Sequence, residues 1–337
     1  MKILCLLSWK PSTRWLWDYL PDSNTQVDFL YVRPTSDRYP GYGKIFSYYP
    51  AYFHQGWQAF QRMTDYDIIV AWEANTALPL ALLRSLAGRR QPALFVLNFV
   101  LKGRPVHDFL PLARFAMRSV NRITCLSQAE IKEYCRLLDF PSERCTKLQG
   151  PFRDYFEGSS RAVSNGNYIF SAGRSHRDYH TLAEAVRDLS VPVIINARPF
   201  NVKGIQPADN LKINPFLPFD HYLLMLEAAR FVVVPLLPAR HASGETFMIQ
   251  AMTASKAVIA SQTFSTQEMI APGVNGLLVP PGDPQALRQN ILMLLDNPEL
   301  VKRIGQAARQ HYQEHWSFPV VARQVDEMIQ QTISQRN

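Results

Sequence analysis

Short apolar runs alternate with amphipathic stretches along the first half of the chain. Four runs are rich in Ile, Leu, Val and Phe and have the length of buried strands. The stretches between them carry apolar residues at helical spacing, and Ser127 with Glu130 forms a capping box in front of the last one. The pattern predicts strands at 1–7, 65–72, 92–100 and 122–127, and helices at 76–88, 109–120 and 128–138.

A polar segment, 153–167, interrupts this alternation and is the expected linker, because it is rich in Gly, Ser and Asn. The alternation then restarts. It predicts strands at 168–173, 191–197, 230–236 and 275–279, and helices at 180–189, 220–229 and 283–296. Strands and helices in this order build parallel sheets covered on both faces. We therefore predict an α/β protein with two Rossmann-like, doubly wound domains facing a cleft, at 1–152 and 168–316.

Composition adds limits to this picture. The 337 residues are enough for two domains, and 47% hydrophobic with 19% charged residues is ordinary for a globular protein. No apolar run reaches the roughly 20 residues of a membrane span, and no signal peptide is recognised, so a cytoplasmic location is expected. The four cysteines form no CxxC pair and no cluster with zinc-ligand spacing. Reduced thiols and no metal are expected.

The net charge of +8 favours anionic partners such as phosphates or an acidic membrane surface. Nucleic acid is not expected, because the basic residues are scattered and no binding motif is present.

The stretch 239–262 predicts an anion-binding helix start. Its helical part carries little charge and follows a small turn that contains Ser243 and Gly244. The first turn of a helix has unpaired N–H groups that favour an anion. Gly244 allows close approach, while Ser243 and Thr246 add hydroxyl donors. Simple capping of a buried helix by Ser243 or Thr246 explains the turn equally well.

A second turn, in 171–179, points to the same chemistry. Gly173 follows a predicted strand, and Arg174 and Arg177 come directly after it. Two guanidinium groups at the carboxyl end of a strand suit bidentate binding of phosphate oxygens. The alternative is two solvated arginines, one of them paired with Asp178.

The second half of the chain resembles the donor domain of retaining GT-B glycosyltransferases of family 4. The resemblance runs through "GRSHRDYHTLAEA", "SGETFMIQAMTASKAVIAS", "GVNGLLVPPGDPQAL" and "HWSFPVVARQVDEM", in the family's order. These motifs cover most of residues 168–328, and "GVNGLLVPPGD" is the most specific of them. The first half matches only in its rhythm of strands and helices.

The resemblance implies a nucleotide-sugar donor held by the second half. The family's diphosphate-binding Arg and Lys fall on Arg174 and Arg177, and its glycine turn falls on Gly244 to Thr246. Its paired glutamates fall on Ala242 and Gln250, neither of which is Glu. Gln250 can still hydrogen-bond a ribose diol. The implied donor-binding residues are Gly173, Ser243, Gly244, Glu245, Thr246 and Gln250, with Glu245 replacing the first family glutamate.

The first half departs further from the family. Its first loop reads "SWKPSTRW", with no glycine, and the family's histidine at the end of a later strand aligns with Asn98. His107 lies on a nearby loop, and Glu73 follows the strand 65–72. Helix capping near Asn75 accounts for Glu73 equally well. The residues implied for catalysis are Arg174, Arg177, Asn98 and Glu245.

The reaction implied is sugar transfer with retention to a hydroxyl acceptor. Arg174, Arg177 and the helix start would stabilise the leaving diphosphate in place of a metal ion, so no cofactor is expected beyond the donor, for which a UDP-sugar is favoured. An inverting reaction would need a general base, for which Glu73, His107 and Asp108 are the candidates. Two alternatives stay open: a nucleotide-sugar epimerase of the same fold, and a nucleotide-sugar binding protein without activity.

The acceptor is expected to be a saccharide or a lipid-linked molecule. The segment 38–63 is rich in Tyr, Phe and Trp with interspersed Arg and Lys, which suits peripheral contact with an anionic membrane at its inner face. A packed aromatic loop accounts for the same composition. The resemblance also implies that a last helix, 318–334, packs back on the first domain.

Overall fold

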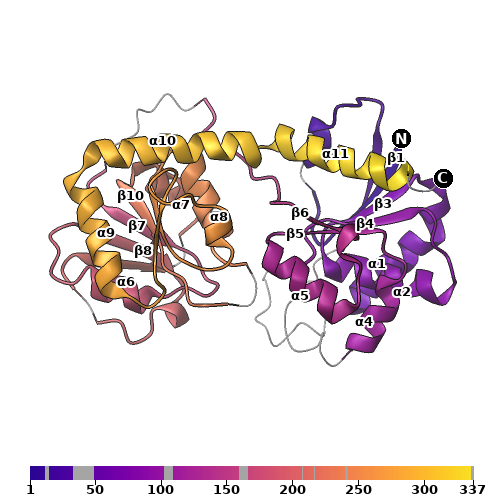
Figure 1. Cartoon of the computed structure of the whole chain (residues 1–337), viewed down its shortest axis with the longest axis horizontal. Coiled ribbons are helices and arrows are strands. Elements are labelled where there is room, and N and C mark those ends of the chain that lie inside the picture. The colour runs from indigo at the N-terminus through magenta and orange to yellow at the C-terminus, as the bar shows by residue number, and fades with distance from the viewer. Residues whose placement is uncertain are drawn as a thin grey trace. The chain divides into compact units, whose positions relative to one another are not determined.

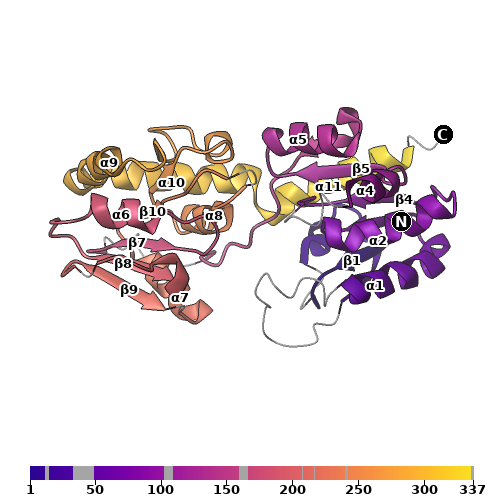
Figure 2. The same cartoon turned by 90° about the horizontal axis from the view of Figure 1, so that it is seen from below.

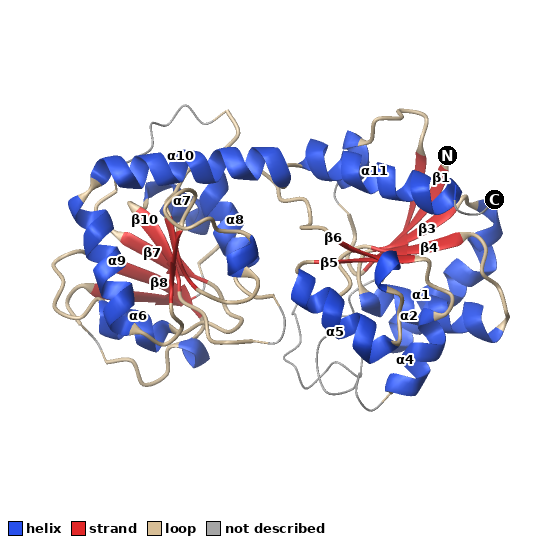
Figure 3. Cartoon of the chain, viewed as in Figure 1, coloured by secondary structure: helices blue, strands red, loops and turns tan. Residues whose placement is uncertain are grey.

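The chain forms two compact units, drawn in Figure 1. The first is Met1–Pro151 together with the segment that starts at Phe318, and the second is Phe152–Ser317. Each has a six-stranded sheet between helices (Figure 3), so the predicted pair of doubly wound domains is confirmed. The computed structural model describes residues 1–11, 15–32, 49–101, 109–158, 166–206, 208–215, 217–239 and 242–334.

The strands of the first sheet are parallel and pair in the order β2-β1-β3-β4-β5-β6. Because both faces of a parallel sheet are covered, its central strands β3 and β4 are apolar along their whole length, and β1 is apolar after Lys2. The edge strand β2 mixes exposed and half-buried residues. The bounds are β1 (Lys2–Leu7), β2 (Gln26–Tyr31), β3 (Ile68–Ala71), β4 (Ala93–Val96), β5 (Arg122–Cys125) and β6 (Cys145–Lys147).

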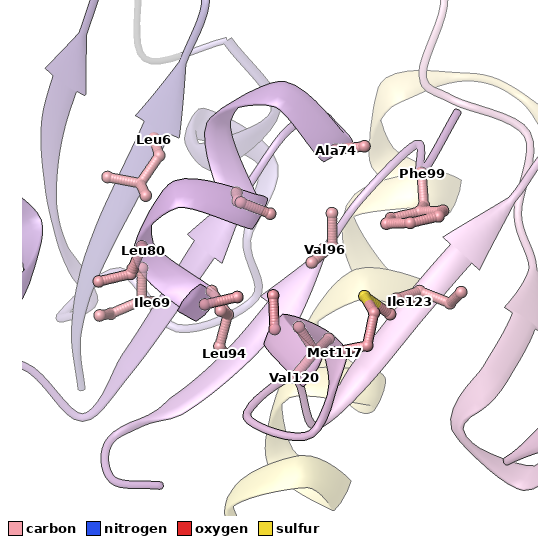
Figure 4. Close-up of a cluster of buried hydrophobic side chains, with 14 of the residues drawn as sticks. Leu6, Ile69, Ala74, Leu80, Leu94, Val96, Phe99, Met117, Val120 and Ile123 are labelled. Carbon is pink, nitrogen blue, oxygen red and sulfur yellow. The ribbon is translucent and has the colours of Figure 1, made fainter. Parts of the chain in front are cut away.

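Alternate residues of these strands point to opposite faces of the sheet and belong to two separate hydrophobic cores. Leu4 and Leu6 of β1 belong to a cluster with four helices on one face, part of which is shown in Figure 4. Ile3, Cys5 and Leu7 belong to a cluster on the other face. The helices of the first cluster are α1 (Tyr49–Arg62), α2 (Ala74–Leu86), α4 (Leu110–Met117) and α5 (Gln128–Leu138), and the second is covered by η1 (Trp15–Tyr19) and α11 (Phe318–Ser334).

Helix α11 contributes an apolar stripe to the second of these cores. Val321, Val325 and Ile329 are buried there with residues of β1, β3 and β4. Both ends of the chain therefore lie in the first unit (Figure 2). One face of the first sheet is covered by residues that come last in the sequence.

The second sheet is also parallel, with the order β12-β11-β10-β7-β8-β9. Helices α6 and α9 pack on one face, α7 and α8 pack on the other, and α10 contributes to both cores. The strands are β7 (Ile169–Ala172), β8 (Val193–Ala197), β9 (Leu211–Pro215), β10 (Phe231–Val234), β11 (Val258–Ser261) and β12 (Leu277–Val279). The helices are α6 (Tyr179–Ala185), α7 (Phe219–Ala228), α8 (Glu245–Thr253), α9 (Pro284–Asp296) and α10 (Pro298–His315).

The boundary between the units differs from the expected linker. It falls between Pro151 and Phe152, and the described part of 153–167 belongs to the second unit. Phe156 is buried in the core of that unit, and Asp154 forms an ion pair with Arg309 of α10 at 2.7 Å. The polar composition of the segment hid these two anchoring contacts. Residues 159–165 lie outside the described part of the chain.

Close packing of α10 on the segment after α8 generates a stability prediction. A Cβ atom on Gly305 would collide with the backbone carbonyl of Ser255. Replacing a helical glycine by alanine normally gains about 1 kcal/mol, but overpacking costs about 1–3 kcal/mol. We expect Gly305→Ala to lower the free energy of unfolding, as measured by urea denaturation. The matched control is Gln306→Ala on the exposed face of α10, for which little change is expected. A more stable Gly305→Ala protein would contradict this packing.

Candidate functional site

Helix α8 begins at a glycine with a constrained backbone. Gly244 has a φ of +100°, which residues with a side chain rarely adopt. A Cβ atom there would also lie 3.1 Å from Leu236 Cδ1. Every residue of α8 except Thr246 is buried. This burial explains why the helix carries so little charge.

The start of α8 lies beside the turn that follows β7. Strands β7 and β10 are parallel neighbours, so the segments after them share the carboxyl edge of the sheet. His176 Nδ1 lies 3.3 Å from Ser243 Oγ, and the His176 carbonyl accepts a hydrogen bond from the Leu237 N–H at 2.9 Å. The two turns that sequence reasoning singled out are thus neighbours. A helix start at such an edge favours an anionic ligand.

Arg177 is built into the turn after β7. Its side chain is 8% exposed, and its Nε and Nη1 donate to the carbonyls of Ala172 and Ser175 at 3.0 and 2.9 Å. Gly173, with a φ of +125°, lies against the guanidinium, which a Cβ atom there would overlap. Burial lowers the pKa of Arg177, and nearby Tyr179 and Glu245 oppose that shift. The positive charge therefore lies under the turn.

Arg174 has a different environment, because its side chain is exposed. Its backbone carbonyl accepts a hydrogen bond from Asn201 Nδ2 at 2.8 Å, which fixes the turn below it. The sequence alternative of an arginine paired with Asp178 is not seen: the Asp178 carboxylate caps α6, accepting from the Thr181 N–H at 3.1 Å and its hydroxyl at 2.7 Å. Of the two arginines, Arg174 is the one whose side chain faces solvent.

Gln250 lies on α8 and is buried with Tyr222 of α7. The Tyr222 hydroxyl donates to Gln250 Oε1 at 2.6 Å, and burial raises the Tyr222 pKa. Glu245 is buried in the first turn of α8, close enough to Arg177 to affect its pKa, and Ala242 is half-buried. The implied contact of Gln250 with a ribose therefore has its amide N–H₂ as the remaining donor.

In the first unit, Asn98 follows β4 at the carboxyl edge of the first sheet. Its φ is +51°, and its N–H donates to Thr124 Oγ1 at 3.0 Å. Asn98 Oδ1 is buried with no hydrogen-bond partner among the described residues. It borders a small hollow whose other lining residues include Trp72, Thr124 and Gly150. An unsatisfied acceptor at a strand end suits a hydroxyl donor.

Sequence reasoning missed an aromatic cluster beside Asn98. Trp15 and Trp72 are in edge contact with ring centroids 4.3 Å apart, and Trp9 contacts both. All three are half-buried. The signal was the pair of tryptophans in "SWKPSTRW", where the family has glycines. In the same edge, Glu73 Oε1 accepts a hydrogen bond from Ser8 Oγ at 3.1 Å.

Several residues of interest lie outside the described part of the chain. They include His107, Asp108 and residues 38–48 of the aromatic segment. Among the described residues, no three His, Cys, Asp or Glu side chains gather in a way that could hold a metal ion.

Sequence comparison matches part of the second unit to a known family. Residues 206–311 match the family "Glycosyl transferases group 1". An uncharacterized glycosyltransferase of Methanocaldococcus jannaschii is 32% identical over 92 residues, which are 27% of this chain and 25% of that protein. A second from the same organism is 24% identical over 87 residues, 26% of this chain and 22% of the relative. The match therefore spans about a quarter of the length of these curated relatives.

Structural comparison covers nearly the whole chain. The Anabaena protein HepE, solved in complex with UDP, has a TM-score of 0.71 at 16% identity and covers 98% of this chain and 100% of its own. Its complex with UDP-glucose has a TM-score of 0.69 at 17% identity, covering 99% and 100%. Sucrose-phosphate synthase of Thermosynechococcus elongatus has a TM-score of 0.74 at 16% identity, covering 99% and 100%. At such identities the likeness shows the fold, which is of the GT-B type.

The two arginines of the turn generate a contrasting stability prediction. Arg177→Ala removes two hydrogen bonds from a charged, buried group, each of which contributes about 1.5–3 kcal/mol. We expect a clearly lower melting temperature for Arg177→Ala and an unchanged one for Arg174→Ala, measured by circular dichroism. Arg177→Lys should restore little of the lost melting temperature, because lysine lacks the planar guanidinium group that donates in two directions. Equal melting temperatures for all three variants and the wild type would show that Arg177 does not support the turn.

Proposed function

We propose that this protein is a glycosyltransferase that moves a sugar from a nucleotide diphosphate to a hydroxyl acceptor, with retention, as in family 4. The observation that carries the proposal is the edge of the second sheet, where the Arg174 turn and the start of α8 lie together. The match of residues 206–311 to a glycosyltransferase family supports it. So does the GT-B fold.

The donor diphosphate is proposed to lie at the start of α8. Gly173 and Gly244 give the two turns their positive-φ backbone, and Arg174 supplies the exposed charge. UDP is the favoured nucleotide, because structures of the same fold have been solved with UDP and UDP-glucose. Arg177, held beneath the turn, adds positive charge at short range.

In the proposed reaction the acceptor oxygen forms a bond to the anomeric carbon of the sugar. At the same time, the bond between the anomeric carbon and the diphosphate oxygen breaks. Attack comes from the face that the diphosphate leaves, and the hydroxyl proton passes to the departing oxygen. Negative charge accumulates on the diphosphate, where Arg174, Arg177 and the start of α8 stabilise it. Arg177 and the backbone of the turn need no reorganisation, because the turn is already fixed by Asn201 and by the buried Arg177.

The acceptor is proposed to bind at the carboxyl edge of the first sheet. The half-buried side-chain amide of Asn98 would hydrogen-bond an acceptor hydroxyl, and the faces of Trp9 and Trp72 would contact a sugar ring. A saccharide or lipid-linked acceptor fits this combination of one polar group and several aromatic rings.

Donor binding is tested by calorimetric titration with UDP and GDP. We expect Arg174→Ala to weaken nucleotide diphosphate binding by roughly 1.5–3 kcal/mol, because a charge-assisted hydrogen bond is lost. Arg177→Ala should weaken it too, together with its loss of stability. Unchanged affinity in Arg174→Ala would remove the diphosphate from this turn.

Product analysis by NMR then separates the reactions. Incubation with the UDP-sugar should give transfer, or slow hydrolysis when no acceptor is present, with retained anomeric configuration in the sugar product. Conversion of the nucleotide-sugar to its epimer would instead indicate an epimerase. Intact donor under every condition would indicate a binding protein.

We further propose peripheral binding of the first unit to an anionic membrane at the cytoplasmic face. Phe53 and Trp57 are 44% and 48% exposed on α1, and Arg89 and Arg118 lie over the rings of Phe60 and Phe115. Aromatic and basic residues together suit a lipid headgroup region. None of the described helices is long and apolar enough to cross a membrane.

Vesicle sedimentation tests this contact. We expect binding to anionic but not neutral vesicles, weakened at high salt, since each basic residue contributes about 1 kcal/mol near the surface. Trp57→Ala combined with Arg89→Ala should reduce sedimentation, whereas Leu292→Ala, an exposed apolar residue of the second unit, should not. Protein that stays in the supernatant with anionic vesicles at low salt would favour a small soluble acceptor.

A further inference from the structure

Two exposed aromatic side chains meet at the start of α7. Phe219 is 48% exposed and Tyr155 is 40% exposed, and their rings are in edge contact with centroids 5.1 Å apart at 74°. The inner side of Phe219 stacks on Tyr222 at 5.9 Å and 23°. Arg153 lies over the Tyr155 ring at 5.6 Å. The two rings therefore form a supported corner with apolar surface left open to solvent.

This aromatic corner, Phe219 with Tyr155, is connected to α8 by direct contacts. Tyr222, on which Phe219 stacks, donates its hydroxyl to Gln250 Oε1 at 2.6 Å. Gln250 follows the glycine at the start of α8 by six residues, about 9 Å along the helix axis. A ligand with its diphosphate at the start of α8 and its ribose at Gln250 can direct its base toward Tyr222 and the corner beyond it.

The chemistry of the corner fits a flat aromatic ligand. Open ring faces stack on nucleobases, and each such stack contributes to binding without depending on base identity. A packed role for the rings would bury them, yet Phe219 leaves about half of its surface exposed although Tyr222 on the same helix is buried. The Phe219 ring is also held by its stack on Tyr222, which is itself hydrogen-bonded to Gln250. Little side-chain freedom is therefore lost when a base stacks on Phe219.

We propose that the aromatic corner of Phe219 and Tyr155 is the platform on which the nucleobase of the donor stacks. This rests on the proposed function, because it assumes that a nucleoside diphosphate occupies the start of α8. The corner supplies affinity for the base and leaves the diphosphate to Arg174 and the helix start. It extends the donor site from the turn after β7 to the start of α7.

The test compares a ligand with a base to one without. UDP and inorganic pyrophosphate are titrated by calorimetry against the full chain. Phe219→Ala is expected to weaken UDP binding by roughly five- to a hundredfold and to leave pyrophosphate binding unchanged, because pyrophosphate has nothing to stack. Tyr155→Ala should have a smaller effect of the same kind, and Tyr155→Phe none. Persistent pyrophosphate binding shows that each variant is folded.

Leu224→Ala is the matched control. It removes an apolar side chain of similar exposure, 51%, from the same helix, and UDP binding should not change. Phe219→Trp keeps a stacking ring, so it should retain UDP affinity and show fluorescence quenching by UDP but not by pyrophosphate.

The outcomes distinguish this inference from the proposed function. UDP binding that survives Phe219→Ala and Tyr155→Ala unchanged would overturn the stacking platform while leaving the donor site at α8. Equal losses of UDP and pyrophosphate binding in a folded Phe219→Ala protein would also overturn it. A wild-type chain that binds neither UDP nor GDP would overturn the proposed function and the platform together.

Discussion

A parallel sheet must be covered on both faces, and both sheets of this protein follow that constraint. Their inner strands are mostly apolar on the two sides, and alternate residues serve separate cores. The polar and charged groups proposed to act on a ligand lie instead at the ends of the strands. Arg174, His176 and Ser243 gather at the carboxyl edge of one sheet, and Ser8, Glu73 and Asn98 at the carboxyl edge of the other. The position of these polar residues thus follows from the way the sheets are packed.

Within the second unit, the turn after β7 holds two arginines with different roles: one supports the turn and the other faces solvent. Arg177 and Arg174 are three residues apart and have the same side chain, yet one is buried and the other is exposed. The difference arises because Gly173 has no side chain, which leaves room for the Arg177 guanidinium beneath the backbone. The Arg177 guanidinium donates hydrogen bonds to backbone carbonyls. It would therefore act on a ligand through its electrostatic field and not through a direct hydrogen bond. Arg174 remains able to move toward a ligand.

The apolar pattern was sufficient to predict most inner strands and the two-domain fold, because buried strands and capped helices are local signals. It missed β2, β6 and β9, edge strands without a buried apolar run. It also missed the helices α1, whose surface exposes aromatic rings, and α10. Arg174, Arg177 and Gly244 were recognised from turns and spacing. The buried state of Arg177, the bond between Tyr222 and Gln250, and the cluster of Trp9, Trp15 and Trp72 depend on residues distant in sequence, which local patterns do not connect.

The position of α11 has a consequence for the order in which the protein acquires its structure during synthesis. Strands β1, β3 and β4 leave the ribosome before the second unit does, but the cluster around Ile3, Cys5 and Leu7 is completed by Val321, Val325 and Ile329. Domains usually fold as units as they emerge. Here the part of this face that α11 covers stays exposed while the entire second unit is translated. The nascent chain thus carries an exposed hydrophobic surface throughout that interval, in which a molecular chaperone that shields such surfaces can act on this face.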